Sequence, residues 1–263
     1  MRKLPFVLIA AAGCAAGSAT AQSHGARGEA EAASAPAIES TSGRLSARPT
    51  VREAAAIAPK PGVSPLELDG KRDGRIFIPK DYRADRPAPL IVLLHGAGAD
   101  GASILGAVQR EAERAGAIVL APDARGATWD VLRGGFGPDV RFIDEALRKT
   151  FERYSIDPSR VALAGFSDGG SYALSLGQAN GDLFGSIIAF SPGFSAPPQQ
   201  VGKSRIFVSH GVGDGVLPID PCSRTIVPRL RGQGYDVRFV EFDGGHSVPA
   251  SIAHEAMTWW TGR

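Results

Sequence analysis

The chain has 263 residues, of which 43% are hydrophobic, and its formal net charge at pH 7 is +2. This length suits one domain of about 200 residues with an extension, and the apolar content is ordinary for a globular protein. The near-neutral charge gives no reason to expect a nucleic-acid partner. The sequence contains no phosphate-binding loop, no dinucleotide fingerprint and no zinc-type spacing of cysteine or histidine, so we expect neither a cofactor nor a metal.

The first 21 residues have the features of an export signal. The basic pair Arg2-Lys3 precedes an apolar run over 4–12, and Ala19-Thr20-Ala21 is a small-x-small cleavage site. The apolar run is too short for a transmembrane helix, so no membrane-spanning segment is predicted. A second interpretation stays open, because residues 11–14 resemble a bacterial lipobox and cleavage before Cys14 would leave a lipid-anchored protein. We prefer cleavage after Ala21, which predicts a periplasmic or secreted protein.

Residues 22–62 have a composition that disfavours folding. They are rich in Ala, Ser, Glu, Arg, Gly and Pro, and no aromatic residue occurs between Phe6 and Phe77. Such a segment buries too little surface to offset the entropy lost on ordering. The sequence therefore predicts a signal peptide over 1–21, a disordered linker over 22–62 and one folded domain over 63–263.

Beyond the linker, segments typical of strands alternate with segments of helical periodicity. The apolar run at 90–94 is typical of a parallel strand buried on both faces. Further strands are expected at 75–79, 116–121, 161–164, 184–190, from 207 onward and at 237–242. Helices are expected at 103–115, along the apolar stripe Val140, Ile143, Leu147 and Phe151, from Pro221 with a kink at Pro228, and at 252–260. This alternation predicts an α/β fold, with a mostly parallel central sheet, right-handed connections and helices on both faces.

The pentapeptide Gly165-Phe166-Ser167-Asp168-Gly169 lies between a predicted buried strand and a predicted helix. A Gly-x-Ser-x-Gly motif in this context is typical of the nucleophile elbow of the α/β-hydrolase fold. The turn holds the serine in strained backbone geometry, and the flanking glycines let the strand and the helix approach each other. Ser167 is therefore the candidate nucleophile.

A serine nucleophile needs a general base, normally histidine, and the histidine needs a carboxylate to orient it. In this fold the order along the chain is Ser, then Asp or Glu, then His. Asp214 lies in a glycine-rich loop after the strand that begins at 207, and His246 follows Gly-Gly after the strand at 237–242. Both lie past C-terminal strand ends, where open α/β sheets build their sites. Each residue alone also suits an ordinary turn or loop, but together with Ser167 they predict a catalytic triad.

Other acidic and histidine side chains are weaker candidates. Asp243 lies too close in sequence to His246 to be the usual acid, although it could support the site. Asp220 is expected to cap the following helix, and His95 and His210 are predicted to be structural, because each ends a strand before a glycine.

An oxyanion hole is predicted where the strand at 90–94 runs into His95-Gly96-Ala97-Gly98. Lipases and esterases place a related loop here, and one of its N–H groups binds the developing oxyanion together with the N–H of the residue after the nucleophile. We assign these donors to the backbone of Ala97 and Asp168. The alternative is an ordinary strand-to-helix turn.

These motifs resemble the phospholipase/carboxylesterase family of small serine esterases. The set consists of His95-Gly96-x-Gly98, Gly165-x-Ser167-x-Gly169, His210-Gly211-x-x-Asp214-x-x-Leu217-Pro218 and Gly244-Gly245-His246. The stretches 139–143 and 154–161 are also similar to secreted polyhydroxybutyrate depolymerases and feruloyl esterases. The resemblance covers about residues 64–262 and implies hydrolysis of small or lipid-like carboxylic esters by Ser167, Asp214 and His246. It leaves the acyl and alcohol groups undecided.

Two further functions stay open beside a serine carboxylesterase. A small serine peptidase of the same fold is one, although such enzymes usually carry a gating domain. A non-catalytic binding module is the other, although its usual sign, a lost triad residue, is missing. Trp129 and Phe136 either line an acyl pocket beside Ser167 or pack at the sheet edge, and the oligomeric state stays open.

Overall fold

The computed structural model describes residues 42–49 and 60–262. The expected export signal, Cys14 and most of the expected linker lie outside these residues. The strands are β1 (Gly62–Pro65), β2 (Gly74–Ile78), β3 (Ala88–Leu94), β4 (Ile118–Pro122), β5 (Ile156–Phe166), β6 (Ser186–Phe190), β7 (Arg205–Gly211) and β8 (Val237–Phe242). The helices are α1 (Gly101–Ala115), α2 (Pro138–Arg153), α3 (Asp168–Ala179), α4 (Ser223–Gly232) and α5 (Ala250–Thr261), with a short 3₁₀ helix η1 (Asp130–Arg133).

The described strands form one mixed sheet in the order β1-β2-β4-β3-β5-β6-β7-β8. Strand β2 is antiparallel to both of its neighbours, whereas the strands from β4 to β8 in this order pair in parallel. The predicted α/β fold with a mostly parallel sheet is confirmed. Because the parallel strands all end at the same edge, the loops that follow β3, β5, β7 and β8 are brought close together.

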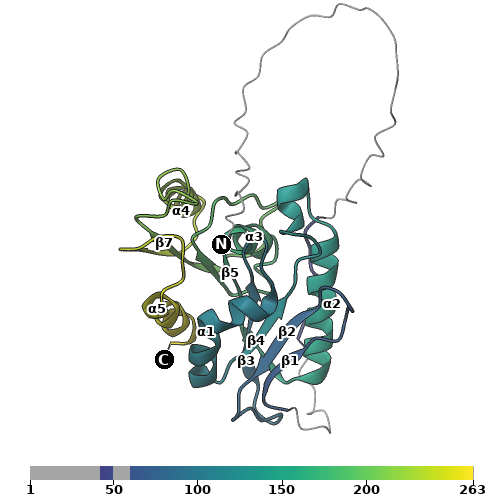
Figure 1. Cartoon of the computed structure of the whole chain (residues 1–263). Helices are drawn as coiled ribbons and strands as arrows, with labels where there is room; N and C mark the ends of the chain where they lie inside the picture. Colours follow the sequence, from purple (N-terminus) through teal and green to yellow (C-terminus); the bar gives the residue numbers. More distant parts are fainter. Residues whose placement is uncertain (1–41, 50–59, 263) are drawn as a thin grey trace, which may run out of the picture. The chain divides into compact units, whose positions relative to one another are not determined.

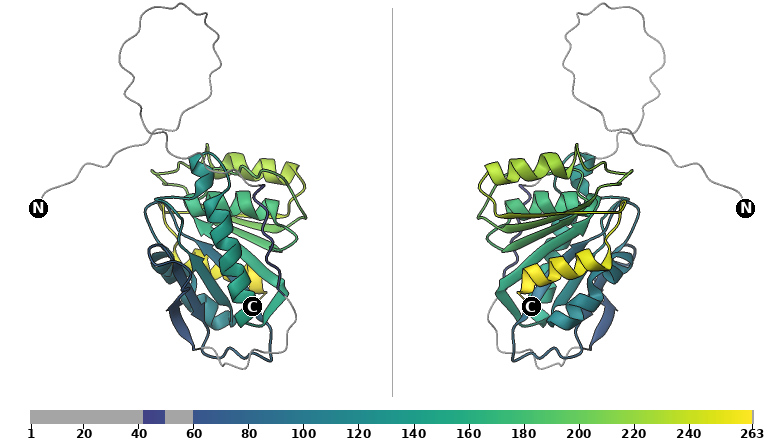
Figure 2. Two further views of the ribbon diagram at one scale, coloured as in Figure 1. Left: turned by 90° about the vertical axis from the view of Figure 1, so that its right-hand side faces the viewer. Right: turned by 90° about the vertical axis from the view of Figure 1, so that its left-hand side faces the viewer.

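Helices cover the sheet on two faces, as the α/β pattern predicted (Figures 1 and 2). On one face, α1 and α5 pack over a cluster that includes Ile91 and Phe207. On the other face, the buried sides of α2, α3 and α4 join a larger cluster that includes Val92 and Leu163. Strand β3 is buried along its whole length, which explains its uninterrupted apolar sequence.

Strand β5 begins earlier than the sequence predicts. Residues 157–160 near its start are exposed or partly exposed, so the continuous apolar signal starts only at Val161. Ile156 nevertheless pairs with Ala88, and the register of β3 against β5 shifts before the regular ladder begins at Leu90. Backbone pairing therefore extends the strand past the segment that side-chain pattern identifies.

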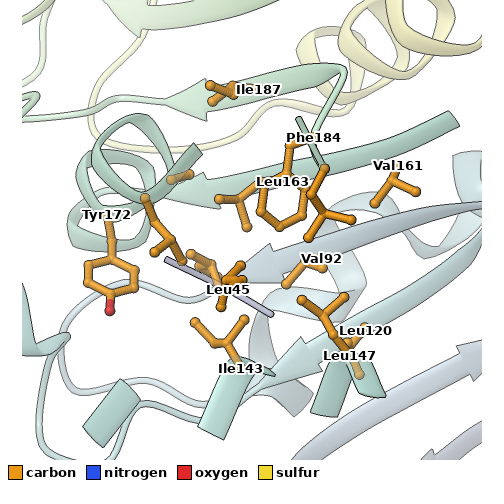
Figure 3. Packing of buried hydrophobic residues seen from close by; sticks show 14 of the residues in the cluster. Leu45, Val92, Leu120, Ile143, Leu147, Val161, Leu163, Tyr172, Phe184 and Ile187 are labelled. Carbon is orange, nitrogen blue, oxygen red and sulfur yellow. The ribbon is translucent and has the colours of Figure 1, made fainter. Parts of the chain in front are cut away.

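The short segment 42–49, which we call the strap, differs from the expected disordered linker. Leu45 is 2% exposed and packs in the larger core cluster, which also contains Ile143 and Leu163 (Figure 3). Its backbone N–H donates to Asn180 Oδ1 at 2.9 Å. The expectation was wrong for these residues because the two apolar side chains, Leu45 and Ala47, are too few to give a sustained periodicity. Their hydrogen-bond partners also lie about 100 residues or more further along the chain.

Among residues 42–49 and 60–262, no helix combines the length and the hydropathy needed to cross a membrane.

Candidate active site

Ser167 lies on a sharp turn between β5 and α3. Its backbone has φ 58° and ψ −121°, a conformation that residues other than glycine rarely adopt. The turn is also crowded: a Cβ at Gly165 would overlap the carbonyl oxygen of Gly169, and one at Gly169 would overlap that of Leu94. The two glycines therefore permit the close approach of strand and helix, and the strained serine is held by its surroundings.

The imidazole of His246 lies between Ser167 and Asp214. Its Nε2 is 2.8 Å from Ser167 Oγ, and its Nδ1 is 2.6 Å from Asp214 Oδ2. Since a carboxylate accepts hydrogen bonds, Nδ1 carries the proton and Nε2 is left to accept from the serine hydroxyl. The ring of Phe166 packs on the imidazole with centroids 4.7 Å apart, which fixes the orientation of His246 further.

The carboxylate of Asp214 is buried but well supplied with donors. Its Oδ1 accepts from the backbone N–H groups of Val216 and Leu217, both at 2.9 Å. Burial raises the pKa of this carboxyl, but the hydrogen bonds from His246 and from the two N–H groups outweigh burial and hold the pKa below its ordinary value. Asp214 is therefore ionised and suited to stabilise a positively charged imidazole.

The two predicted oxyanion donors, the N–H groups of Ala97 and Asp168, belong to segments next to Ser167. Gly96 packs against Ser167, since a Cβ at position 96 would lie 3.3 Å from the Cβ of Ser167, and Ala97 follows at an exposed position. Asp168 is the first residue of α3, where N–H groups have no partner inside the helix. Among the described residues, neither the N–H of Ala97 nor that of Asp168 takes part in a loop or side-chain hydrogen bond. Both are available to a ligand beside Ser167.

His210 has a closer relation to the site than the sequence suggested. Its Nε2 is 2.7 Å from the carbonyl oxygen of Leu217 and 3.2 Å from Asp214 Oδ2, and its Nδ1 is 2.7 Å from Ser223 Oγ. The structural role expected for His210 thus includes support of the loop that carries Asp214. The spacing of four residues in His-Gly-x-x-Asp is the signal that could have indicated this contact.

Trp129 and Phe136 both lie in the interior. Trp129 is fully buried and stacks on Tyr172 of α3, with ring centroids 5.1 Å apart, and Phe136 packs on the same tyrosine at 5.6 Å. Their side chains therefore belong to the packing between η1 and α3 and not to an open acyl pocket.

Among the weaker candidates, Asp220 contacts α4. The prediction that Asp220 caps α4 was wrong: the N-cap is Cys222, without a side-chain hydrogen bond to the helix, and Asp220 instead forms an ion pair with Arg224 at 2.8 Å. In the described part of the chain, no group of three or more His, Cys, Asp or Glu side chains is arranged to hold a metal ion.

Comparison with known proteins places the chain among esterases. A family model described as "Putative esterase" matches residues 66–210. "Probable feruloyl esterase C" of Aspergillus oryzae is 28% identical over 216 residues, which cover 67% of this chain and 77% of the relative. The "Bifunctional acetylxylan esterase/xylanase XynS20E" of Neocallimastix patriciarum is 30% identical over 163 residues, covering 57% of this chain and 22% of the relative.

Solved structures support the same fold. The crystal structure of esterase PE8 superposes with a TM-score of 0.59 at 24% identity, covering 71% of this chain and 96% of that one. A CE1 ferulic acid esterase from Anaeromyces mucronatus superposes with a TM-score of 0.58 at 19% identity, covering 84% of this chain and 96% of that one. Because the family model matches more than half of the sequence, the chain belongs to this esterase family, and it is a carboxylic ester hydrolase of the α/β-hydrolase fold.

Proposed function

We propose that the protein hydrolyses carboxylic esters through an acyl-enzyme on Ser167, with His246 as the base and Asp214 as the group that orients it. The observation that carries this proposal is the continuous chain of hydrogen bonds from Ser167 Oγ through His246 to Asp214. Such a chain activates a hydroxyl that is otherwise a poor nucleophile.

In the first half of the reaction, Ser167 Oγ attacks the ester carbonyl carbon while His246 Nε2 takes the hydroxyl proton. The carbonyl oxygen becomes an oxyanion, which accepts hydrogen bonds from the N–H groups of Ala97 and Asp168. His246 then returns the proton to the departing alkoxide, and the acyl group stays on Ser167. The ionised Asp214 stabilises the imidazolium during this step.

In the second half, water takes the place of the alcohol. His246 accepts a proton from the water, the resulting hydroxide attacks the acyl carbon, and a second oxyanion forms in the same place. Its collapse breaks the bond to Ser167 Oγ, which takes the proton back from His246. The products are one alcohol and one carboxylic acid.

Feruloyl esters are the substrate class that we propose. Three curated relatives from Aspergillus bear the name "Probable feruloyl esterase C", at 28% or 29% identity. This similarity favours esters of aromatic acids as substrates over the amide bonds of peptides. A small serine peptidase stays the alternative, and tests with ester and peptide substrates distinguish the two.

We also propose that the protein is exported. The basic start, the apolar run and Ala19-Thr20-Ala21 support cleavage after Ala21. Mass spectrometry of the protein from its native host tests this: a mature N-terminus at Gln22 supports export of a free protein, and a diacylglyceryl group on Cys14 overturns it.

The decisive experiment for the chemistry is labelling with a serine-directed phosphonate. We expect one covalent adduct on Ser167 and no adduct in Ser167→Ala, which also loses hydrolysis of feruloyl and short-chain acyl esters. Ser159→Ala is the matched control, because Ser159 is exposed at the opposite end of β5. Wild-type turnover by Ser167→Ala would reject the proposal, and hydrolysis of peptides but not of esters would favour the peptidase.

A further inference from the structure

The loop after β4, residues 124–130, contacts both halves of the proposed oxyanion hole; we call it the clamp loop. We propose that Thr128 and Trp129 of this loop are positioning residues that fix the separation of the two N–H donors, Ala97 and Asp168. The inference rests on the proposed function, because it assigns these residues a role in the same site.

The first half of the hole is held by three hydrogen bonds to the clamp loop. Trp129 Nε1 donates to the carbonyl oxygen of His95 at 2.8 Å, and the N–H of Ala124 donates to His95 Nε2 at 2.9 Å. On the far side of the donor residue, the N–H of Gly98 donates to the carbonyl oxygen of Ala127 at 2.7 Å. The donor is thus fixed from both sides.

The second half is held by the residue next to Trp129. Thr128 Oγ1 donates to Asp168 Oδ2 at 2.6 Å. Trp129 itself stacks on Tyr172, one helical turn after Asp168. Thr128 and Trp129 are consecutive residues, so one short stretch of the clamp loop contacts both the loop of one donor and the helix of the other.

This link matters because the oxyanion exists only in the transition state and in the short-lived states next to it along the reaction. Donors must lie about 2.7–3.1 Å from that oxygen to stabilise it. A shift of one donor therefore raises the barrier of the chemical step without weakening substrate binding.

Thr128 also keeps the carboxylate of Asp168 away from the proposed oxyanion hole. The carboxylate of Asp168 belongs to the residue whose N–H faces the oxyanion, and a carboxylate that turned toward the hole would repel the developing negative charge. The hydroxyl of Thr128 holds the carboxylate on the clamp loop by a charge-assisted hydrogen bond.

Thr128 is the residue that allows a clean test. Trp129 is fully buried in the core, so its replacement would disturb packing. Thr128 is half-buried, and its side chain makes one hydrogen bond. Thr128→Val removes the hydroxyl and keeps the shape, and Thr128→Ser keeps the hydroxyl.

For Thr128→Val we expect kcat to fall about 10- to 100-fold, somewhat less than on loss of a donor, with KM and the thermal midpoint unchanged. Thr128→Ser should recover most of the lost kcat. Thr261→Val is the matched control, because Thr261 is half-buried and donates one side-chain hydrogen bond, to Met257 in α5. It should leave kcat unchanged.

Two further measurements separate positioning from a merely structural effect. A boronic acid that forms a tetrahedral anion on the nucleophile should lose affinity by the same factor as kcat/KM. In an Asp168→Ala background, Thr128→Val should have no further effect, because the hydroxyl acts through that carboxylate.

Unchanged kcat in Thr128→Val, a loss confined to KM, or additive effects with Asp168→Ala would overturn the inference. Its failure is distinct from failure of the proposed function: Ser167→Ala would then still be inactive. Activity retained by Ser167→Ala would instead remove the proposed function and the inference with it.

Discussion

Arg44 of the strap donates two hydrogen bonds to the carboxylate of Asp182, at 2.7 and 2.8 Å. The same guanidinium donates to the carbonyl oxygen of Ala179, at the end of α3. This oxygen belongs to the last turn of the helix, where carbonyl groups have no partner inside the helix. The strap is thus fastened to the C-terminal end of the helix whose first turn follows Ser167.

Removal of the strap should lower stability. We expect a chain that begins at residue 60 to unfold at a lower temperature than one that begins at residue 42, because the first lacks Leu45 and its hydrogen bonds. Leu45→Ala alone should cost about 2–5 kcal/mol in the free energy of unfolding. Val63→Ala is the control, because Val63 is 47% exposed, and its cost should be below about 1 kcal/mol. Equal thermal midpoints for the two shortened chains would contradict a structural role of the strap.

The triad residues should behave as one unit in kinetics. We expect Ser167→Ala and His246→Ala each to remove nearly all ester hydrolysis, and the double variant to be no worse than either one. Asp214→Asn should cost about 10⁴-fold in kcat, because the amide favours the wrong tautomer of His246. Circular dichroism should show that each variant is folded. Effects that multiply in the double variant would mean that the two residues act independently.

The sequence predicts those features of the fold and the site that have a local signal. The apolar run of β3 and the Gly-x-Ser-x-Gly turn at Ser167 are visible in a few consecutive residues. Asp214 and His246 could be chosen because parallel strands end at one edge, so order along the chain implies proximity. The structure brings these three side chains together, with hydrogen-bond distances between them.

The sequence does not predict contacts between distant residues when neither segment has a recognisable pattern. Nothing in the residues around Thr128 indicates a hydrogen bond to Asp168, 40 positions later. The strap is missed for the same reason, because Leu45 lies in a polar stretch and its partner Asn180 is 135 positions away. Trp129 is an intermediate case: the sequence marks a large aromatic side chain near the site, but only packing decides that it is buried.

The contact of His210 with the triad acid predicts that its loss lowers both stability and activity. In His210→Leu, Asp214 loses a buried donor and the carbonyl oxygen of Leu217 loses its partner. An unsatisfied buried acceptor costs about 1–3 kcal/mol, so we expect lower thermal stability and a lower kcat/KM. His254→Leu is the control, because His254 is largely exposed on α5, where it contacts Glu111. Wild-type kcat/KM in His210→Leu would show that the acid loop needs no support from this ring.

Asp130, the last residue of the clamp loop, forms a buried pair with Asp139 of α2. The N–H of Asp130 donates to Asp139 Oδ2 at 2.6 Å, and the N–H of Asp139 donates to Asp130 Oδ2 at 2.8 Å. Burial raises the pKa of Asp139 to about 6, and the negative charge of Asp130 adds to the rise, against the hydrogen bonds from N–H groups. The folded protein therefore binds a proton at Asp139 more tightly than the unfolded chain does.

This raised pKa gives stability a definite dependence on pH. Between about pH 4 and pH 6 the folded state holds more protons than the unfolded state, so the contribution of Asp139 to stability falls as pH rises. The full change is about 3 kcal/mol, from a shift of about two pKa units. In Asp139→Asn this dependence is absent, so the stability of the wild type relative to the variant should be greater at pH 4 than at pH 7. Urea unfolding of both proteins at pH 4, 5, 6 and 7 measures the difference, with exposed Asp81→Asn as the control. A difference that stays constant, or that grows with pH, would show that Asp139 is ionised throughout this range in the folded protein.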